Sequence, residues 1–347
     1  MIKNDLFQKL NRPKITDNIL LLTHIDMDGA GPSILLQSCF KNVTVRHCSN
    51  NTMSEDIKNS ILEDEQDPQY DFIIACDISC NKYDAAIINK SKNCNKLVIL
   101  DHHMTAEYLN VYDWACVSSI TPSDTKRIEY IDSKCLQSGT SLMYDYLDYC
   151  NMLQHIKNPA LCMQMVNTIT LYDTWDWVNI YQKQNMDPYK LNTLFSIYGT
   201  DMFEETMISR INNITVNKLF NNTDKLLLRI EDEKIKSHIK RIEKHIHTGS
   251  LTLKNETYSI VLCYTSDYLQ DTFDLMKTSY PDKDIYIINY GTGISMRAMK
   301  PDINIGLIAK EYGGGGHPGA GGFKITWEDQ LTYLAKTFSG TINVDTE

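Results

Sequence analysis

The chain has 347 residues, 42% of them hydrophobic, and a formal net charge of −10 from 44 acidic and 34 basic residues. This length is typical of two domains. The excess of acidic residues argues against a long basic groove for duplex nucleic acid. The sequence contains no run of about 18 apolar residues, so we expect no membrane span. The first seven residues lack the apolar core of a signal peptide, so we expect a cytoplasmic protein. The ten cysteines form no CxxC pair, which favours buried, reduced thiols over a zinc site.

The N-terminal part alternates short apolar runs with helical patterns. The runs at 18–23, 43–48, 70–76 and 96–100 predict strands, and the segments between them, 31–40, 54–62 and 83–89, predict helices. Near-continuous apolar strands separated by helices indicate a parallel sheet covered on both faces. Residues 135–180 are expected to be helical, with a hydroxyl of the Ser138–Ser141 segment as an N-cap.

A second α/β pattern follows a charged helical stretch at 214–247. It predicts strands at 259–263, 284–288 and 294–298, a helix between the first two, and another helix over 303–312. We therefore predict an α/β protein with an N-terminal parallel-sheet domain at 1–210, a helical connector at 211–250 and a smaller C-terminal α/β domain at 251–347.

Three clusters of Asp and His directly follow predicted strands: His24-x-Asp26-x-Asp28-Gly29, Asp77, and Asp101-His102-His103. In an extended segment the alternate residues of the first cluster face the same way. Taken singly, the first cluster could be a solvated turn, and Asp77 could be a helix N-cap or a solvated loop residue. The carboxyl ends of parallel strands, however, gather at one edge of the sheet, where ligands bind. Carboxylates and imidazoles without thiolates suit two divalent cations such as Mn²⁺. Asp173 is ambiguous alone, because Asp176 would share its helical face.

A glycine-rich segment near the C-terminus, Gly313 to Gly322, has seven glycines and His317 in its middle. Such a segment suits a loop whose backbone N–H groups meet an anion, especially at a helix N-terminus. Arg297 either grips the same anion or forms a surface ion pair. Together the clusters point to metal-assisted phosphoester hydrolysis, in which two cations acidify a water and offset charge on the phosphoryl oxygens.

These motifs, in this order, resemble the DHH phosphoesterase family with its DHH-associated C-terminal domain. The resemblance covers roughly residues 15–325, and its most specific parts are Asp101-His102-His103 and the Gly-Gly-Gly-His-Pro run that ends at Pro318. The compact first motif, with the stretches 101–106 and 172–177, is similar to the nano-RNase branch, which degrades very short oligoribonucleotides. One departure is that residues 319–322, after His317, supply no hydroxyl where many members have one.

The resemblance implies a role for each motif residue. One manganese would be held by His24, Asp26 and Asp77, and a second by Asp28, Asp77, His102 and Asp173, with Asp77 bridging the two and Mg²⁺ or Co²⁺ as other options. Asp77 and His103 would be the catalytic residues, and the metal site would lie in the cleft between the domains. Substrate would contact His103, Arg297, Gly314, Gly315, Gly316 and His317.

The expected activity is that of a manganese-dependent phosphodiesterase, an exoribonuclease that releases mononucleotides from short oligoribonucleotides or linear dinucleotides. The alternative substrates are cyclic dinucleotides, nucleoside 3′,5′-bisphosphate and polyphosphate. A catalytically silent nucleotide sensor is the alternative outside enzymes, and the filled ligand positions argue against it. We expect short RNA or a dinucleotide as the partner, with no long duplex and no membrane, and leave a homodimer open.

Overall fold

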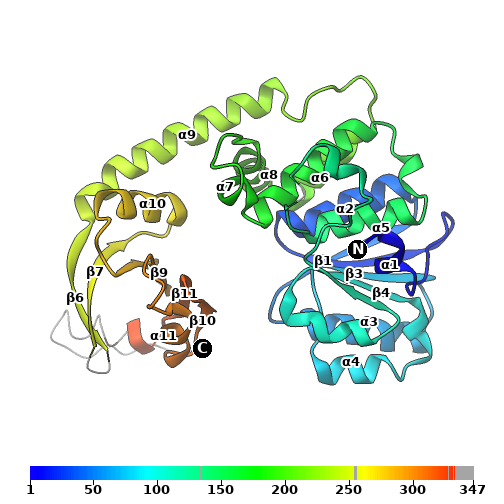
Figure 1. Cartoon of the computed structure of the whole chain (residues 1–347), viewed down its shortest axis with the longest axis horizontal. Helices are drawn as coiled ribbons and strands as arrows, with labels where there is room; N and C mark the ends of the chain where they lie inside the picture. The colour runs from blue at the N-terminus through cyan, green and yellow to red at the C-terminus, as the bar shows by residue number, and fades with distance from the viewer. Residues whose placement is uncertain (133, 254–255, 327, 331, 333–347) are drawn as a thin grey trace, which may run out of the picture. The chain divides into compact units, whose positions relative to one another are not determined.

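The structure is a computed structural model that describes residues 1–132, 134–253, 256–326, 328–330 and 332. It divides into two compact units, Met1–Leu228 and Arg229–Glu347 (Figure 1). The division falls inside the helix α9 (Asn222–Ile242), within the stretch expected to connect two domains. Among the described helices, none combines the length and the apolar character that a membrane crossing needs.

The N-terminal unit is built on a five-stranded parallel sheet in the order β2-β1-β3-β4-β5. Its strands are β1 (Ile19–His24), β2 (Val43–Cys48), β3 (Phe72–Cys76), β4 (Leu97–Asp101) and β5 (Ala115–Val117). The four predicted strands are confirmed, whereas the three-residue β5 was not predicted because it is too short to form a pattern. After β1 the chain forms β2 on one side of β1, and it then crosses to form β3 on the other side of β1. The carboxyl ends of these two strands are therefore adjacent at a topological switch point.

Helices cover both faces of this sheet (Figure 1). On one face, Ile19 and Leu21 pack with α2, α5, α6 and α8, and on the other face Leu20 and Leu22 pack with α3 and α4. This alternation explains why the strand is apolar throughout. The α-helices of the unit are α1 (Lys3–Phe7), α2 (Met27–Cys39), α3 (Met53–Gln66), α4 (Lys82–Ile88), α5 (Gly139–Tyr149), α6 (Pro159–Asp173), α7 (Asp176–Asn179) and α8 (Asp187–Ile211).

Short 3₁₀ helices complete the connections of the chain. They are η1 (Lys92–Lys96), η2 (Met104–Val111), η3 (Lys126–Glu129), η4 (Leu153–His155) and η5 (Glu243–His245).

The helix α2 begins at Met27, four residues before the predicted start. Asp26 is its N-cap, and the Asp26 Oδ1 accepts a hydrogen bond from the Gly29 backbone N–H at 3.0 Å. Asp28 therefore lies in the first helical turn rather than in an extended segment. The three side chains of the first motif reach the site from a strand end, a cap and a helix, not from one face of a strand.

The C-terminal unit has a six-stranded mixed sheet in the order β10-β11-β9-β8-β7-β6, in which β7 and β8 are parallel and the other pairs antiparallel. Its strands are β6 (His247–Leu253), β7 (Glu256–Tyr264), β8 (Ile285–Asn289), β9 (Gly293–Ala298), β10 (Gly315–His317) and β11 (Ala320–Lys324). The helix α10 (Leu269–Ser279) covers one face and α11 (Ile305–Glu311) the other. The predicted strands and helices of this unit are confirmed, and β6, β10 and β11 were not predicted.

The glycine-rich segment differs from the expected loop at a helix N-terminus. It follows the C-terminal end of α11, where Gly313 has a φ of +76°, and then forms the β10–β11 hairpin. A Cβ on Gly322 would lie 2.3 Å from the Ile294 carbonyl oxygen, so the close approach of neighbouring strands requires glycine there. Much of the glycine density therefore has a packing cause. The side chain of His317 lies outside the described residues.

Candidate metal and catalytic site

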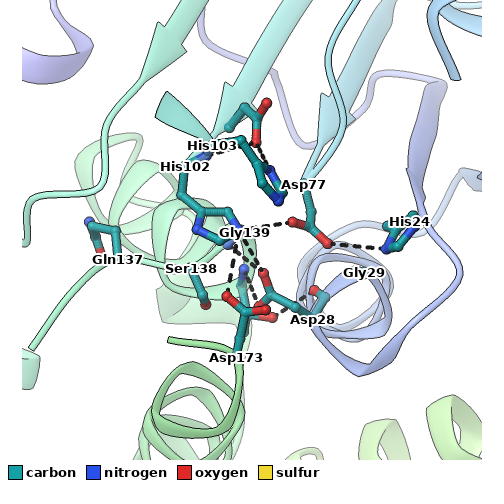
Figure 2. A network of polar contacts seen from close by, with 12 residues as sticks. His24, Asp28, Gly29, Asp77, His102, His103, Gln137, Ser138, Gly139 and Asp173 are labelled. Atoms are coloured by element: carbon teal, nitrogen blue, oxygen red, sulfur yellow. Dashed lines mark hydrogen bonds and ion pairs between the residues drawn. The ribbon is translucent and has the colours of Figure 1, made fainter. Parts of the chain in front are cut away.

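The first group of ligand-type side chains lies where β1 and β3 end. The Nδ1 of His24 is 2.7 Å from Asp26 Oδ2. The same nitrogen is 4.0 Å from Asp77 Oδ2 (Figure 2). Asp77 follows β3 with a φ of +62°, in the left-handed region that non-glycine residues rarely adopt, and its backbone N–H donates to the Leu100 carbonyl at 3.0 Å. Such strain often persists at functional sites. One ligand atom from each of these three side chains lies within 4.8 Å of the others.

The second group joins three distant parts of the unit. The Nε2 of His102 lies 3.2 Å from Asp77 Oδ1, 3.5 Å from Asp173 Oδ2 and 3.8 Å from Asp28 Oδ2 (Figure 2). Asp173 is the last residue of α6, which brings it to the site from the helical layer. The two oxygens of Asp77 thus face different histidines, and Asp77 lies between the two groups.

Asp28 is held by the N-terminus of α5. Its Oδ2 accepts from the Gly139 backbone N–H at 2.6 Å, and its Oδ1 from the Thr140 N–H at 3.0 Å. The first N–H groups of a helix have no partner within the helix, and the helix dipole favours an anion at that end. The expected hydroxyl cap of this helix is confirmed at Ser138. The sequence did not reveal that the same turn binds Asp28.

Asp101 orients the second histidine of its motif. It is fully buried, and its Oδ1 accepts from His103 Nδ1 at 2.8 Å and from the backbone N–H groups of His102 and His103 at 2.8 and 3.2 Å. The hydrogen bond to Asp101 raises the pKa of His103. The hydrogen bond to Asp101 fixes the His103 ring at Nδ1. Since the side chain is 55% exposed, the other ring nitrogen is accessible.

The site carries more negative charge than its own cations can balance. Burial, followed by the charges of Asp28 and Asp26, raises the pKa of Asp77 well above its usual range and that of Asp173 to about 9. The groups that pair with these carboxylates are the histidines described above, and burial lowers the pKa of His102, which favours its neutral, ligating form.

Several buried atoms of the site also make no hydrogen bond to any residue that the structure describes. They are His24 Nε2, Asp101 Oδ2 and Asp173 Oδ2. Clustered carboxylates whose oxygens lack hydrogen bonds are costly to bury unless a cation compensates them. The donor set of oxygen and imidazole atoms, without a thiolate, fits divalent cations such as Mn²⁺ or Mg²⁺.

A series of polar contacts from His47, Glu204 and Ser33 reaches the backbone of His24. The Nδ1 of His47 on β2 lies 2.9 Å from the His24 carbonyl oxygen, and its Nε2 lies 3.1 Å from Glu204 Oε1 on α8. The Ser33 hydroxyl donates to the other oxygen of Glu204 at 2.6 Å. The hydrogen bond to Glu204 raises the pKa of His47. No sequence pattern indicated this chain of contacts, because Glu204 belongs to no motif.

All six predicted metal ligands therefore meet in the N-terminal unit, whereas the predicted substrate-binding residues other than His103 lie in the C-terminal unit. Arg297 is on β9, where its Nη1 donates to the Ser295 hydroxyl at 3.2 Å and to the Met296 carbonyl at 3.0 Å. Its guanidinium lies 4.6 Å from the centre of the Phe273 ring. With respect to the described residues, these contacts of Arg297 are hydrogen bonds and a ring contact rather than the surface ion pair of the alternative interpretation.

The chain is similar to known proteins over most of its length. Residues 18–170 match the model of the DHH family, N-terminal domain. The chain is 29% identical over 322 residues to the oligoribonuclease NrnB of Bacillus subtilis strain 168, covering 92% of this chain and 75% of that protein. Similar solved structures include the pGpG-specific phosphodiesterase PggH of Vibrio cholerae, with 16% identity, a TM-score of 0.46 and 92% and 97% of the two chains covered. Another is RecJ of Thermus thermophilus in complex with Mn²⁺, with 11% identity, a TM-score of 0.47 and 96% and 52% covered. The range that matches the DHH family, N-terminal domain, contains the Asp101-His102-His103 motif.

Proposed function

We propose that this protein is a two-metal, manganese-dependent phosphodiesterase that converts short oligoribonucleotides or linear dinucleotides to mononucleotides. The observation that carries the proposal is the position of Asp77, whose Oδ2 faces His24 and whose Oδ1 faces His102. The similarity to an oligoribonuclease over 92% of the chain supports the substrate class. The net charge of −10 also favours a short anionic substrate that is held locally.

Each metal ion would be held by its own set of side chains, and one further side chain would bind both ions. His24 and Asp26 would hold the first ion, Asp28, His102 and Asp173 the second, and Asp77 both. The bound cations would act as Lewis acids on the phosphoryl oxygens and lower the pKa of a water. The N-terminus of α5 keeps the Asp28 oxygens fixed through two backbone N–H groups, so the site is organised before substrate arrives.

His103 would contact the scissile phosphate. Its Nδ1 is fixed by Asp101, and the raised pKa favours the protonated ring. A proton held at Nε2 can be donated to a phosphoryl oxygen or to the leaving oxygen, and the charge strengthens that hydrogen bond.

The C-terminal unit would bind the end of the substrate. Arg297 is fixed by two hydrogen bonds through one nitrogen of its guanidinium, which leaves donors for a phosphate. The β10–β11 hairpin pairs directly beside Arg297, since Ala320 is its partner in the neighbouring strand. Gly314, Gly315, Gly316 and His317 would complete this contact with backbone N–H groups and an imidazole.

The test is a substrate panel incubated with the full chain and Mn²⁺, with products separated by chromatography. The panel holds a linear diribonucleotide, a 24-mer RNA, a cyclic dinucleotide, a nucleoside 3′,5′-bisphosphate and polyphosphate. We expect rapid conversion of the diribonucleotide to mononucleotides, abolished in Asp77→Asn. The matched control is Asp64→Asn, which changes an equally buried aspartate that pairs with Lys96 outside the site.

The other outcomes of this panel each reject part of the proposal. Turnover confined to another substrate would keep the hydrolase and reassign the substrate. Nucleotide and metal binding without any turnover would favour the sensor instead.

A further inference from the structure

The turn that begins α5 packs directly against two of the metal ligands. A Cβ on Gly139 would lie 2.5 Å from the Asp77 Cβ and 3.0 Å from Asp28 Oδ2, and the Gly139 N–H donates to that oxygen at 2.6 Å (Figure 2). The backbone of the turn therefore has no free space on the side of the two carboxylates. Because functional side chains must be held to within about 0.5 Å of their working positions, a small shift of this turn would disturb both ligands.

The same turn is also joined to α6. The hydroxyl of Ser138, just before Gly139, lies 3.1 Å from the hydroxyl of Thr170. Thr170 is three residues before Asp173, the last residue of α6, and so lies on the same side of that helix. The position of the turn is thus linked to a third metal ligand.

A buried polar network lies behind the turn. Its members Arg127, Gln137, Ser141 and Asp145 are each 0% exposed. Gln137 Oε1 accepts from Arg127 Nη2 at 2.5 Å and from the Ser141 hydroxyl at 2.6 Å, and Gln137 Nε2 donates to Asp145 Oδ2 at 3.0 Å. The Ser138 backbone N–H donates to the Ser141 hydroxyl oxygen at 2.8 Å. Gln137 therefore connects a buried ion pair with the first turn of α5.

The ion pair is a poor choice for packing alone. Arg127 Nη2 lies 3.0 Å from Asp145 Oδ2, but the buried Nε and Nη1 of Arg127 make no hydrogen bond to any described residue. Apolar residues in place of a buried ion pair are often neutral or stabilising. Positioning explains the pair better, because an amide that is bonded at both ends holds its neighbours in one arrangement.

We propose that Gln137, held by the Arg127–Asp145 pair, is a positioning residue that fixes the Gly139 turn and so keeps Asp28 and Asp77 in place for the two cations. The proposal rests on the metal site of the proposed function and deepens it, since no sequence motif includes Gln137 or Arg127. Gln137 acts through Ser141 and the backbone of the turn rather than as a ligand.

The test is calorimetric titration of the full chain with Mn²⁺, comparing Gln137→Met with Thr125→Val. Methionine is similar in size to glutamine but removes both polar ends of the amide, so we expect the Mn²⁺ affinity to fall by roughly tenfold to a hundredfold. Thr125 is the matched control, because its hydroxyl donates to the other oxygen of Asp145, Oδ1. Thr125→Val should lower the melting temperature, since it weakens the same network, but leave the Mn²⁺ affinity unchanged.

Hydrogen exchange of the Gly139 and Thr140 amides in the metal-free chain gives a second readout. These amides should exchange faster in Gln137→Met, because the turn is less firmly held, and at an unchanged rate in Thr125→Val. Ser141→Ala removes only the hydroxyl between Gln137 and the turn, and it should change both readouts in the same direction as Gln137→Met. This smaller change decides the question if Gln137→Met does not fold.

The proposal is wrong if the Mn²⁺ affinity and the amide exchange of these variants match those of the unchanged chain. Equal losses of affinity in Thr125→Val would also overturn it, since the network would then support the fold in general. Neither readout needs turnover. A chain that binds Mn²⁺ in this way but hydrolyses no substrate of the panel would therefore reject the phosphodiesterase and keep the positioning role.

Discussion

Two of the buried clusters of charge that the structure describes in the N-terminal unit differ in their balance. In the metal-site cluster (Asp26, Asp28, Asp77, Asp101 and Asp173 with their histidines) carboxylates outnumber cations, and the pKa of Asp77 rises well above its usual range. In the Arg210 cluster, Arg210 Nη2 lies 2.8 Å from Asp224 Oδ2, and Asp224 also accepts from the Tyr198 hydroxyl and the Asn221 N–H, both at 2.6 Å. Asp77 and Asp224 are 4% and 0% exposed, so burial does not separate them. The two clusters differ in their charge balance instead. The excess of carboxylates in the metal-site cluster indicates a site for an added cation, whereas the paired charges of the Arg210 cluster indicate a structural contact.

The same substitution at the two aspartates should therefore have opposite effects. Asp77→Asn is expected to lower turnover by at least roughly a thousandfold, because several kcal/mol of metal-assisted stabilisation depend on that carboxylate. The metal-free protein should melt at an equal or higher temperature, since an amide removes repulsion from its neighbours. Steady-state rates and thermal melting with a chelator check both parts. A clear loss of metal-free stability would mean that Asp77 is mainly structural.

Asp224→Asn should destabilise the fold without affecting the chemistry. It leaves the buried Arg210 without its counter-charge, which costs about 3 kcal/mol or more in the free energy of unfolding. Urea denaturation measures that loss, and the turnover of the protein that remains folded should be unchanged. Asp187→Asn is the control, because its pairing with Lys190 is at the surface and worth little. Equal losses in both variants would remove the contrast between the clusters.

The pH dependence of stability provides a finer test of the excess charge. The pKa of Asp173 is about 9 in the fold and 3.8 in an ordinary environment. Between these values the folded state holds a proton that the unfolded chain releases. The contribution of Asp173 to stability is therefore greatest below about pH 4 and declines as the pH rises toward 9, by at most about 1.4 kcal/mol per pH unit.

This effect is isolated by comparing the unchanged chain with Asp173→Asn in urea denaturation with a chelator. The variant should become progressively more stable than the unchanged chain from pH 4 to pH 9. Mn²⁺ should reverse the trend for the unchanged chain, because the ion needs the deprotonated carboxylate. A difference that does not vary with pH would show that Asp173 is not perturbed.

The sequence predicted the parts of this site that depend on local pattern. Apolar runs indicated the strands, and Asp77 and Asp101 could be placed at strand ends because the runs stop there. The contact between Asp28 and the N-terminus of α5 joins segments 111 residues apart, and no local pattern encodes it. The hairpin in the glycine segment was not predicted, because an anion-binding loop and a tightly packed hairpin both need residues without a Cβ. Asp26 was predicted only as a ligand, although an aspartate before a helix is also a cap signal.

The smallest expected effect lies in the support of His24, which the sequence did not predict. Glu204→Gln keeps the size of the side chain but weakens the hydrogen bond, and removes the charge, that raise the pKa of His47, so His47 should hold the His24 carbonyl less firmly. We expect Mn²⁺ affinity to fall by roughly tenfold, as for other residues behind metal ligands, with turnover at saturating Mn²⁺ nearly unchanged. Metal titration by calorimetry measures this, with Glu205→Gln, at an exposed neighbouring position, as the control. Unchanged affinity would limit His47 and Glu204 to packing α8 against the sheet.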